Sequence, residues 1–120
     1  MKLEKGMYVR TKIGIIGKIV SINKDSDDNN IITIFNGHLH IIHNEIRTEL
    51  DIVKGSHNII DLIEVGDYVN GLKVDVIENS QLFNFNSYDG WKVNITPYDN
   101  ETISIVTKEQ FESMAYKVGE

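Results

Sequence analysis

A seven-residue pattern occurs twice in this chain of 120 residues, and the two copies start 60 positions apart. Leu3–Val9 and Ile63–Val69 both read apolar, Glu, any residue, Gly, any residue, Tyr, Val. A pattern that repeats at half the chain length indicates two structural units that begin alike. We therefore expect two domains, residues 1–58 and 59–120, each the size of a small barrel and either separate or sharing one core.

The same order of strand and turn signals follows each copy of this pattern. Ile, Val, Tyr and Thr are frequent, and such side chains favour a pleated sheet. Asn36-Gly37 and Asn70-Gly71 are two-residue hairpin signals, because both residues tolerate positive φ. We predict an all-β fold with strands at 17–22, 31–35, 38–42, 52–54 and 59–64, the last of which closes the first copy of this order, and at 72–77, 81–86, 91–96, 105–107 and 115–118, the last of which closes the second copy.

Thr107 and Gln110 form a capping-box pattern before the last predicted strand. In such a box the Thr hydroxyl and the Gln side chain each bond to a backbone N–H that the first helical turn leaves without a partner. A short helix is therefore predicted near residues 108–113. Five short strands with a helical turn before the last resemble an SH3-like barrel, so the chain resembles two small SH3-like barrels in tandem.

Two segments carry a second resemblance. Residues 55–70 read Gly-Ser-His-Asn-Ile-Ile-Asp-Leu-Ile-Glu-Val-Gly-Asp-Tyr-Val-Asn, and residues 105–114 read Ile-Val-Thr-Lys-Glu-Gln-Phe-Glu-Ser-Met. Both resemble segments of uncharacterised small proteins of Firmicutes phages and prophages. The resemblance implies an accessory protein of a mobile element, and it brings no known active site with it.

Composition limits the chemistry of the chain. There is no cysteine, which excludes disulfides, thiolate nucleophiles and thiolate metal ligands. No apolar run approaches the roughly 20 residues of a membrane span, and no hydrophobic segment follows Met1–Lys5 to act as a signal peptide. We expect a cytoplasmic protein. No nucleophile lies in a context with a base and an orienting group, since Ser56 and His57 are adjacent in sequence and lack a third partner. We therefore predict a protein that is not an enzyme.

Charge differs strongly between the halves. Residues 1–58 hold eight Lys or Arg against seven Asp or Glu, a net charge of +1, whereas residues 59–120 hold four against eleven, a net charge of −7. An acidic half repels nucleic acid and attracts a basic protein surface. We expect an inhibitor or adaptor of a host protein, for example an anti-CRISPR-like inhibitor of a nucleic-acid-binding nuclease. The acidic residues assigned to this contact are Asp67, Asp75, Glu78, Asp89, Asp99 and Glu101.

The second half also holds most of the aromatic residues. Phe83 and Phe85 share one strand parity, and Trp91 shares another with Val93 and Ile95, so the two rows are expected to face each other across a core. Tyr88 and Trp91 flank the predicted hairpin turn. That position makes them candidates for exposed aromatic anchors at an interface.

A basic stripe in the first half offers a different function. Arg10, Lys12 and Lys18 are near Tyr8, and alternate spacing is expected to place Arg10 and Lys12 on one strand face. Small barrels often bind nucleic acid through such a stripe. Three phosphate contacts would give only weak, salt-dependent affinity, and the same residues also fit an ordinary polar face.

Three of the four histidines lie in His38–His43, and His38 and His40 are candidate ligands of a metal site. With a two-residue turn, Phe35 would pair with His38 and Thr33 with His40, placing both histidines on one face opposite the apolar residues. Zinc readily takes imidazole ligands. The alternative is that His38 and His40 are ordinary residues on the solvent side of a hairpin, in which case no cofactor is expected.

Overall fold

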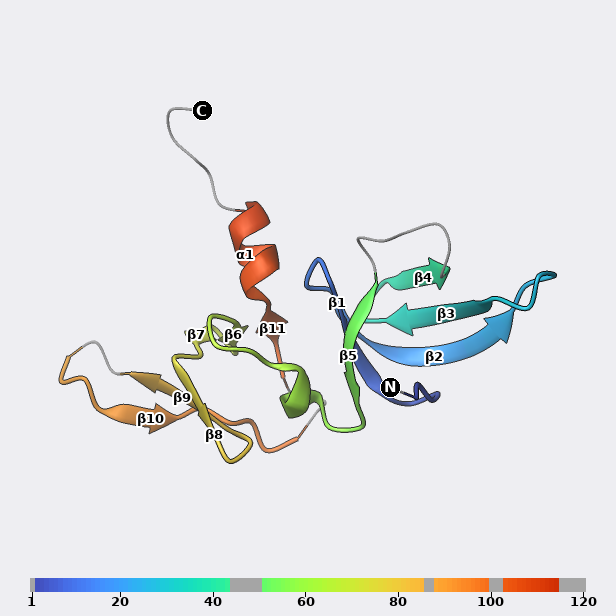
Figure 1. Cartoon of the computed structure of the whole chain (residues 1–120). Coiled ribbons are helices and arrows are strands. Elements are labelled where there is room, and N and C mark those ends of the chain that lie inside the picture. The colour runs from blue at the N-terminus through green and yellow to red at the C-terminus, as the bar shows by residue number, and fades with distance from the viewer. Residues whose placement is uncertain (1, 44–50, 86–87, 100–102, 115–120) are drawn as a thin grey trace, which may run out of the picture. The chain divides into compact units, whose positions relative to one another are not determined.

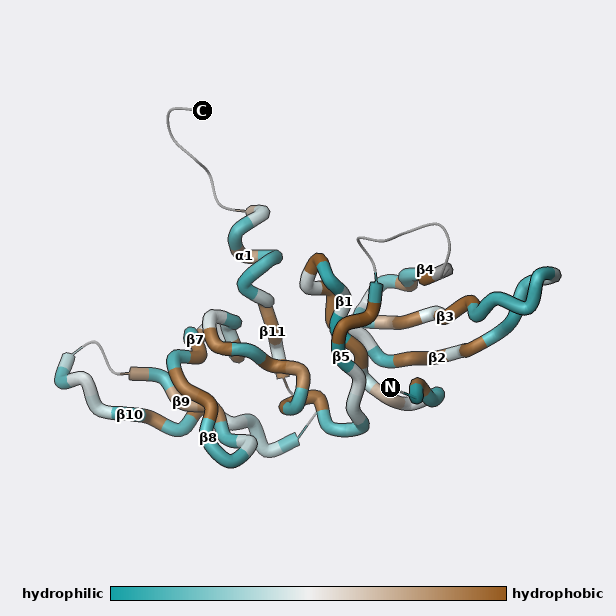
Figure 2. The backbone as a smooth tube through the Cα atoms, viewed as in Figure 1, coloured by the Kyte–Doolittle hydropathy of each residue, from teal (hydrophilic) through white to brown (hydrophobic). Residues whose placement is uncertain are grey.

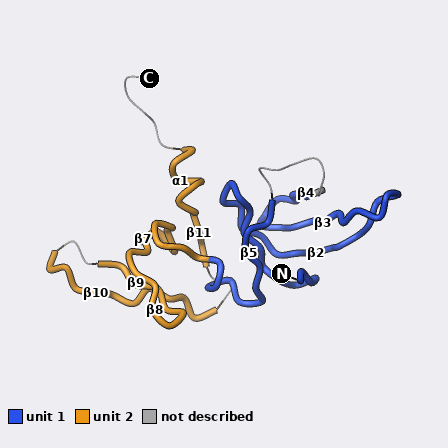
Figure 3. The backbone as a smooth tube through the Cα atoms, viewed as in Figure 1, with its two compact units in different colours: residues 1–62 blue, residues 63–120 orange. Residues whose placement is uncertain are grey.

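The computed structural model describes residues 2–43, 51–85, 88–99 and 103–114. The chain divides into two compact units, residues 1–62 and 63–120 (Figure 3). The described residues are mostly β-structure and contain one short α-helix, which confirms the predicted predominance of strands (Figure 1). No helix in these four ranges is long and apolar enough to cross a membrane.

Unit 1 is built on one antiparallel sheet of five strands in the order β4-β3-β2-β1-β5. Strands β1 to β4 form a meander, and β5 returns to the free side of β1. The strands are β1 Tyr8–Thr11, β2 Ile16–Lys24, β3 Asn30–Phe35, β4 Leu39–His43 and β5 Ile52–Ser56. The loop that joins β2 to β3 is hydrophilic and stands out in Figure 2.

The strand predicted at residues 59–64 is wrong, because Ile59–Leu62 form a 3-10 helix, η1. Asn58 explains the difference. Its side-chain Oδ1 accepts a hydrogen bond from the Ile60 N–H at 3.2 Å, and its carbonyl accepts one from the Asp61 N–H at 3.1 Å. An Asn that bonds to nearby backbone in this way starts a turn and competes with a strand.

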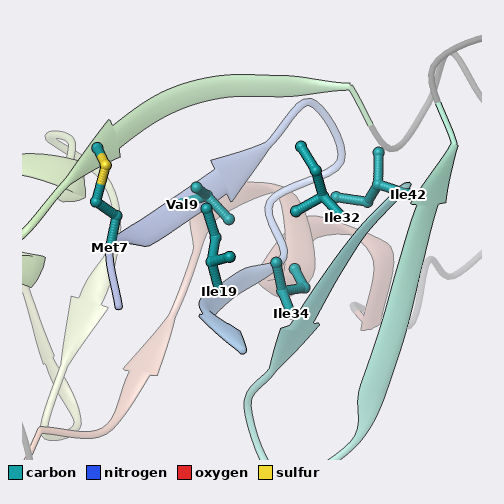
Figure 4. Close-up of a cluster of buried hydrophobic side chains, with 6 residues drawn as sticks. All are labelled: Met7, Val9, Ile19, Ile32, Ile34 and Ile42. Carbon is teal, nitrogen blue, oxygen red and sulfur yellow. The ribbon is translucent and has the colours of Figure 1, made fainter. Parts of the chain in front are cut away.

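The core of unit 1 gathers on one face of the sheet (Figure 4). Period-two alternation sends Val9 of β1, Ile19 of β2 and Ile34 of β3 to this face, where all three are fully buried. Met7, Ile32 and Ile42 complete the cluster. Burial of each such side chain contributes about 1.5 to 3 kcal/mol to folding, which makes this face the main source of stability in unit 1.

The hairpin of β3 and β4 differs by one residue from its predicted register. Phe35 pairs with Leu39, Ile34 with His40, and Thr33 with Ile41. The loop therefore has three residues, and the Asn36 N–H donates to the His38 carbonyl at 3.2 Å while Gly37 has a φ of 104°. A one-residue change of register exchanges the two faces of a strand. As a result, Leu39 and Ile41 point outward from the sheet.

Unit 2 contains two antiparallel sheets of three strands, in the orders β10-β9-β8 and β11-β6-β7. The sheets formed by the described strands are open and do not close into a barrel. The strands are β6 Tyr68–Val69, β7 Leu72–Lys73, β8 Val76–Glu78, β9 Gln81–Phe85, β10 Lys92–Asn94 and β11 Ile105–Val106. The expected strand at 115–118 lies outside the described residues.

The predicted Asn70-Gly71 hairpin turn is confirmed. Asn70 and Gly71 have φ values of 50° and 83°, and Val69 pairs with Leu72 across them. The strand predicted at 72–77 is split into β7 and β8, because the chain leaves one sheet and joins the other at Val74 and Asp75. There the Val74 N–H bonds to the Asp67 carbonyl at 2.8 Å, and the Asp75 N–H bonds to the Phe83 carbonyl at 2.8 Å.

The two copies of the seven-residue pattern form the same tight turn. Gly6 and Gly66 have φ values of 93° and 100°, which favour glycine in both copies. In each turn the glycine N–H donates to a carbonyl of the next segment at 2.9 Å, and the following N–H donates to the Glu carbonyl at 3.1 Å. The likeness extends over these turns, while the sheets built on them differ.

The helix α1, Lys108–Met114, begins at the predicted capping box. The Thr107 N–H donates to Gln110 Oε1 at 3.0 Å, and the Gln110 N–H donates to Thr107 Oγ1 at 3.2 Å. These reciprocal bonds are the ones that the sequence predicts. Phe111 on the helix stacks on Tyr68 of β6, with ring centroids 4.7 Å apart, and this contact fixes the helix against its sheet.

Candidate functional site

Three aromatic side chains are exposed at the turn end of the β9–β10 hairpin. Phe85 ends β9, Trp91 comes directly before β10, and Tyr88 lies in the turn between them. Tyr88 is 97% exposed, Trp91 73% and Phe85 48%. The positions of Tyr88 and Trp91 are those expected of exposed aromatic residues beside a turn. We call these three residues the aromatic tip.

Two carboxylates hold the backbone of the aromatic tip. Asp89 Oδ1 accepts a hydrogen bond from the Trp91 N–H at 2.9 Å, which is an Asx turn, and Asp75 Oδ2 accepts one from the Phe85 N–H at 2.7 Å. Asp75 is half-buried and also accepts a bond from Asn84 Nδ2 at 3.3 Å. Asp75 therefore stabilises the backbone of the hairpin, whereas the Asp89 side chain is exposed next to Trp91.

The expected core between two rows of aromatic and aliphatic residues is wrong. The fully buried residue of β9 is Leu82, and the opposite parity places Phe83 and Phe85 on the face shared with Lys92 and Asn94. Phe83 is half-buried, and Lys92 Nζ lies 4.6 Å from the centre of its ring. The same ammonium forms a 2.9 Å ion pair with Glu78 of β8. Glu78 is exposed, and its negative charge is paired with the positive charge of Lys92.

Asp67 does not belong to an acidic surface, because its side chain is completely buried. Its Oδ2 accepts a hydrogen bond from the Glu64 N–H at 2.7 Å, and its Oδ1 accepts one from the Lys108 N–H at 2.9 Å. The carboxylate joins the turn before β6 to the first residue of α1. Of the other assigned carboxylates, Asp99 is exposed and Glu101 lies outside the described residues.

The predicted basic stripe is not formed. Arg10 is fully buried, and its Nη1 donates to the Leu62 carbonyl of η1 at 3.1 Å. Strand alternation sends Arg10 to the face opposite Val9, and η1 covers that position. Lys12 is exposed just beyond β1, and Lys18 is exposed with its Nζ 5.9 Å from the centre of the Tyr8 ring.

The two candidate metal ligands do not share a strand face. His38 is an exposed loop residue, whereas half-buried His40 pairs with Ile34 and its Nε2 lies 3.2 Å from Asn36 Oδ1. Within the described ranges, no three His, Asp or Glu side chains are placed to hold a metal ion together. The three-residue loop is the physical reason for this arrangement.

Ser56 and His57 bond to different acids. Ser56 Oγ donates to Asp61 Oδ2 at 2.6 Å, and His57 Nε2 lies 3.2 Å from Glu4 Oε2. Both contacts are exposed, and each fits a polar turn. The pair is therefore not arranged as a hydroxyl nucleophile with its base.

Comparison with protein-family models, with curated proteins and with solved structures finds no match to this chain. The site is therefore defined by its own geometry. Sequence reasoning missed Phe85, since the aromatic row was assigned to the core. A signal was available in the sequence, because the residues of β10 that pair with Phe85 and Phe83 are polar. They are Lys92 and Asn94, and polar partners indicate that this face points outward.

Proposed function

We propose that the protein is a non-enzymatic protein-binding module that acts as an inhibitor or adaptor of a host protein, with the aromatic tip as its contact. The observation that carries this proposal is the exposure of Tyr88 and Trp91 beside a turn that Asp89 holds in place. Large aromatic side chains in water are costly unless a partner covers them, and Trp and Tyr are the residues most enriched at interface hot spots.

Charge favours a basic partner. Asp89 and Asp99 are exposed in the described part of unit 2, and residues 59–120 carry a net charge of −7. Exposed carboxylates steer association with a positive surface, and Asp89 lies directly beside the aromatic tip. A nucleic-acid-binding nuclease of the host presents such a surface, and we propose this class of target, which would make the protein anti-CRISPR-like.

We further propose that the protein comes from a mobile element and that its two halves are related to small barrels. The resemblance of residues 55–70 and 105–114 to phage and prophage proteins supports a mobile-element protein that works in the cytoplasm of its host. The matched turns at Gly6 and Gly66 support two halves related to tandem SH3-like barrels. Small barrels of this kind serve many functions, so the function rests on the aromatic tip.

The test is an affinity pull-down of the tagged protein from a Firmicutes host lysate at low and moderate salt, with mass spectrometry and nucleic-acid staining of the eluate. The Tyr88→Ala/Trp91→Ala variant is compared with Tyr98→Ala, since Tyr98 is an equally exposed aromatic residue outside the hairpin. We expect one host protein to be retained by wild type and Tyr98→Ala and lost from the double variant. Each hot-spot aromatic should be worth about 2 kcal/mol, or roughly 30-fold in affinity.

Two results would reject the proposal. One is recovery of the same proteins by the double variant and by wild type. The other is recovery of nucleic acid alone, which would return attention to Lys12 and Lys18.

A further inference from the structure

A second exposed surface lies on unit 1, on the face of the sheet opposite its core. The strand registers join Ser56, Tyr8, Lys18, Phe35 and Leu39 into one row across β5, β1, β2, β3 and β4. The next row joins Ser21, Thr33 and Ile41. These two rows contain no carboxylate. They end at β4 in an apolar patch of Phe35, Leu39 and Ile41.

The patch is exposed along the edge of the sheet. Leu39 is 66% exposed, Ile41 60% and Phe35 48%. Among the strands that the structure places, β4 pairs with β3 only. Sheet edges in native proteins are usually protected by Lys, Pro, a bulge or inward-pointing charges. The sequence of β4, Leu-His-Ile-Ile-His, has no Lys, Pro or acidic residue.

Backbone groups of β4 are also directed outward. The loop-closing bond joins the Asn36 N–H to the His38 carbonyl, and bonded and non-bonded pairs alternate along an antiparallel ladder. Leu39 and Ile41 fall on the non-bonded pairs. Their N–H and carbonyl groups therefore point away from β3, toward the position of a further strand.

The size of the patch decides what can cover it. Side chains of this kind carry on the order of 150 to 200 Å² each, so the exposed parts of the three amount to about 300 Å². A stable interface between two folded proteins, including two copies of this chain, needs about 800 Å² from each partner. A single added strand needs less side-chain area, because its main-chain hydrogen bonds supply much of the affinity.

We propose that the edge of β4 that no described strand covers binds an extended segment of a partner protein as a sixth strand, with apolar side chains at alternate positions beside Leu39 and Ile41. This surface is formed by residues of unit 1, whereas the aromatic tip belongs to unit 2. Substitutions at the aromatic tip leave the β4 edge intact, so failure of one proposal is distinguishable from failure of the other.

The test uses two fluorescein-labelled peptides of equal composition and the full chain. One peptide alternates, Lys-Val-Thr-Val-Thr-Val-Thr-Lys, and the other does not, Lys-Val-Val-Val-Thr-Thr-Thr-Lys. The protein variants are Leu39→Thr/Ile41→Thr, which places a β-branched residue that favours a strand at both positions, and Val53→Thr as a matched change on β5, the other edge of the sheet. Far-ultraviolet circular dichroism verifies that each variant is folded.

We expect fluorescence anisotropy to show binding of the alternating peptide to wild type and Val53→Thr, and at least tenfold weaker binding to the double variant. The non-alternating peptide should bind at least tenfold more weakly than the alternating one. Amide hydrogen exchange at Leu39 and Ile41 should slow when the alternating peptide binds. Absence of binding, or equal binding by the double variant, overturns the proposal. So does a concentration-dependent dimer in sedimentation that the double variant abolishes, since the occupant would then be a second copy.

Discussion

Replacement of Asp67 by Ala should selectively destabilise unit 2. In the native protein the buried Asp67 carboxylate accepts hydrogen bonds from the Glu64 and Lys108 N–H groups. Alanine would leave both donors without this acceptor in a place that water does not reach. A buried donor that loses its partner costs about 1 to 3 kcal/mol, so the two together should cost about 3 kcal/mol or more.

Asp67→Asn should fall between alanine and wild type, because its amide has one acceptor oxygen for two donors. Asp89→Ala is the matched control. Asp89 also accepts a backbone N–H, but it is exposed, so water replaces the lost carboxylate and the cost should stay below about 1 kcal/mol.

Amide hydrogen exchange is the suitable assay, because it reports on each unit separately. A loss of about 3 kcal/mol corresponds to exchange roughly 100-fold faster for the protected amides of β6 and β11. Amides of β2 and β3 in unit 1 should keep their wild-type rates. If Asp67→Ala leaves the exchange of unit 2 within about threefold of wild type, the buried Asp67 carboxylate does not stabilise unit 2 in this way.

Three further predictions concern single residues. Arg10→Met should destabilise unit 1 by about 2 to 4 kcal/mol in denaturant unfolding, because it removes the bond to the Leu62 carbonyl. Lys12→Met should change the free energy of unfolding by less than about 0.5 kcal/mol, and equal effects of the two variants would contradict the burial of Arg10. Thr107→Ala should cost about 1 kcal/mol and lower the helical signal of α1 in carbon chemical shifts, and unchanged shifts would argue against the capping box. Ile34→Ala should cost about 3 kcal/mol through the cavity that it leaves in the unit 1 core, and thermal unfolding within 1 °C of wild type would exclude that packing.

Much of the strand content could be predicted from local pattern. Asn70-Gly71 fixed a turn because its two residues supply positive φ, and Thr107 with Gln110 fixed a helix start because their side chains bond to nearby backbone. Such signals act within a few residues. They do not depend on the rest of the fold, and at these two places they predicted the structure correctly, whereas the similar signal at Asn36-Gly37 predicted a two-residue turn where the loop has three residues.

Prediction failed where one residue decided a face or where a distant segment covered a surface. Counting His38 as part of a strand shifted the register and placed Leu39 and Ile41 inside, whereas the three-residue loop places them outside. Arg10 has the parity of an exposed residue, yet it is buried, and its guanidinium bonds to η1, some 50 residues later in the chain. For the candidate site, the turn predicted the exposure of Tyr88 and Trp91, but the assignment of Phe85 to a core had no support beyond parity.

The return of β5 to β1 also determines the order in which unit 1 is completed during synthesis. A nascent chain can form the meander of β1 to β4 from neighbouring segments, but Tyr8 pairs with Ser56 and Arg10 with Lys54. The carbonyl that receives the Arg10 guanidinium belongs to Leu62. Until that residue has left the ribosome, Arg10 stays hydrated and one side of β1 stays unpaired. Burial of this charge is thus a late step in the folding of unit 1, made only after the whole unit has emerged.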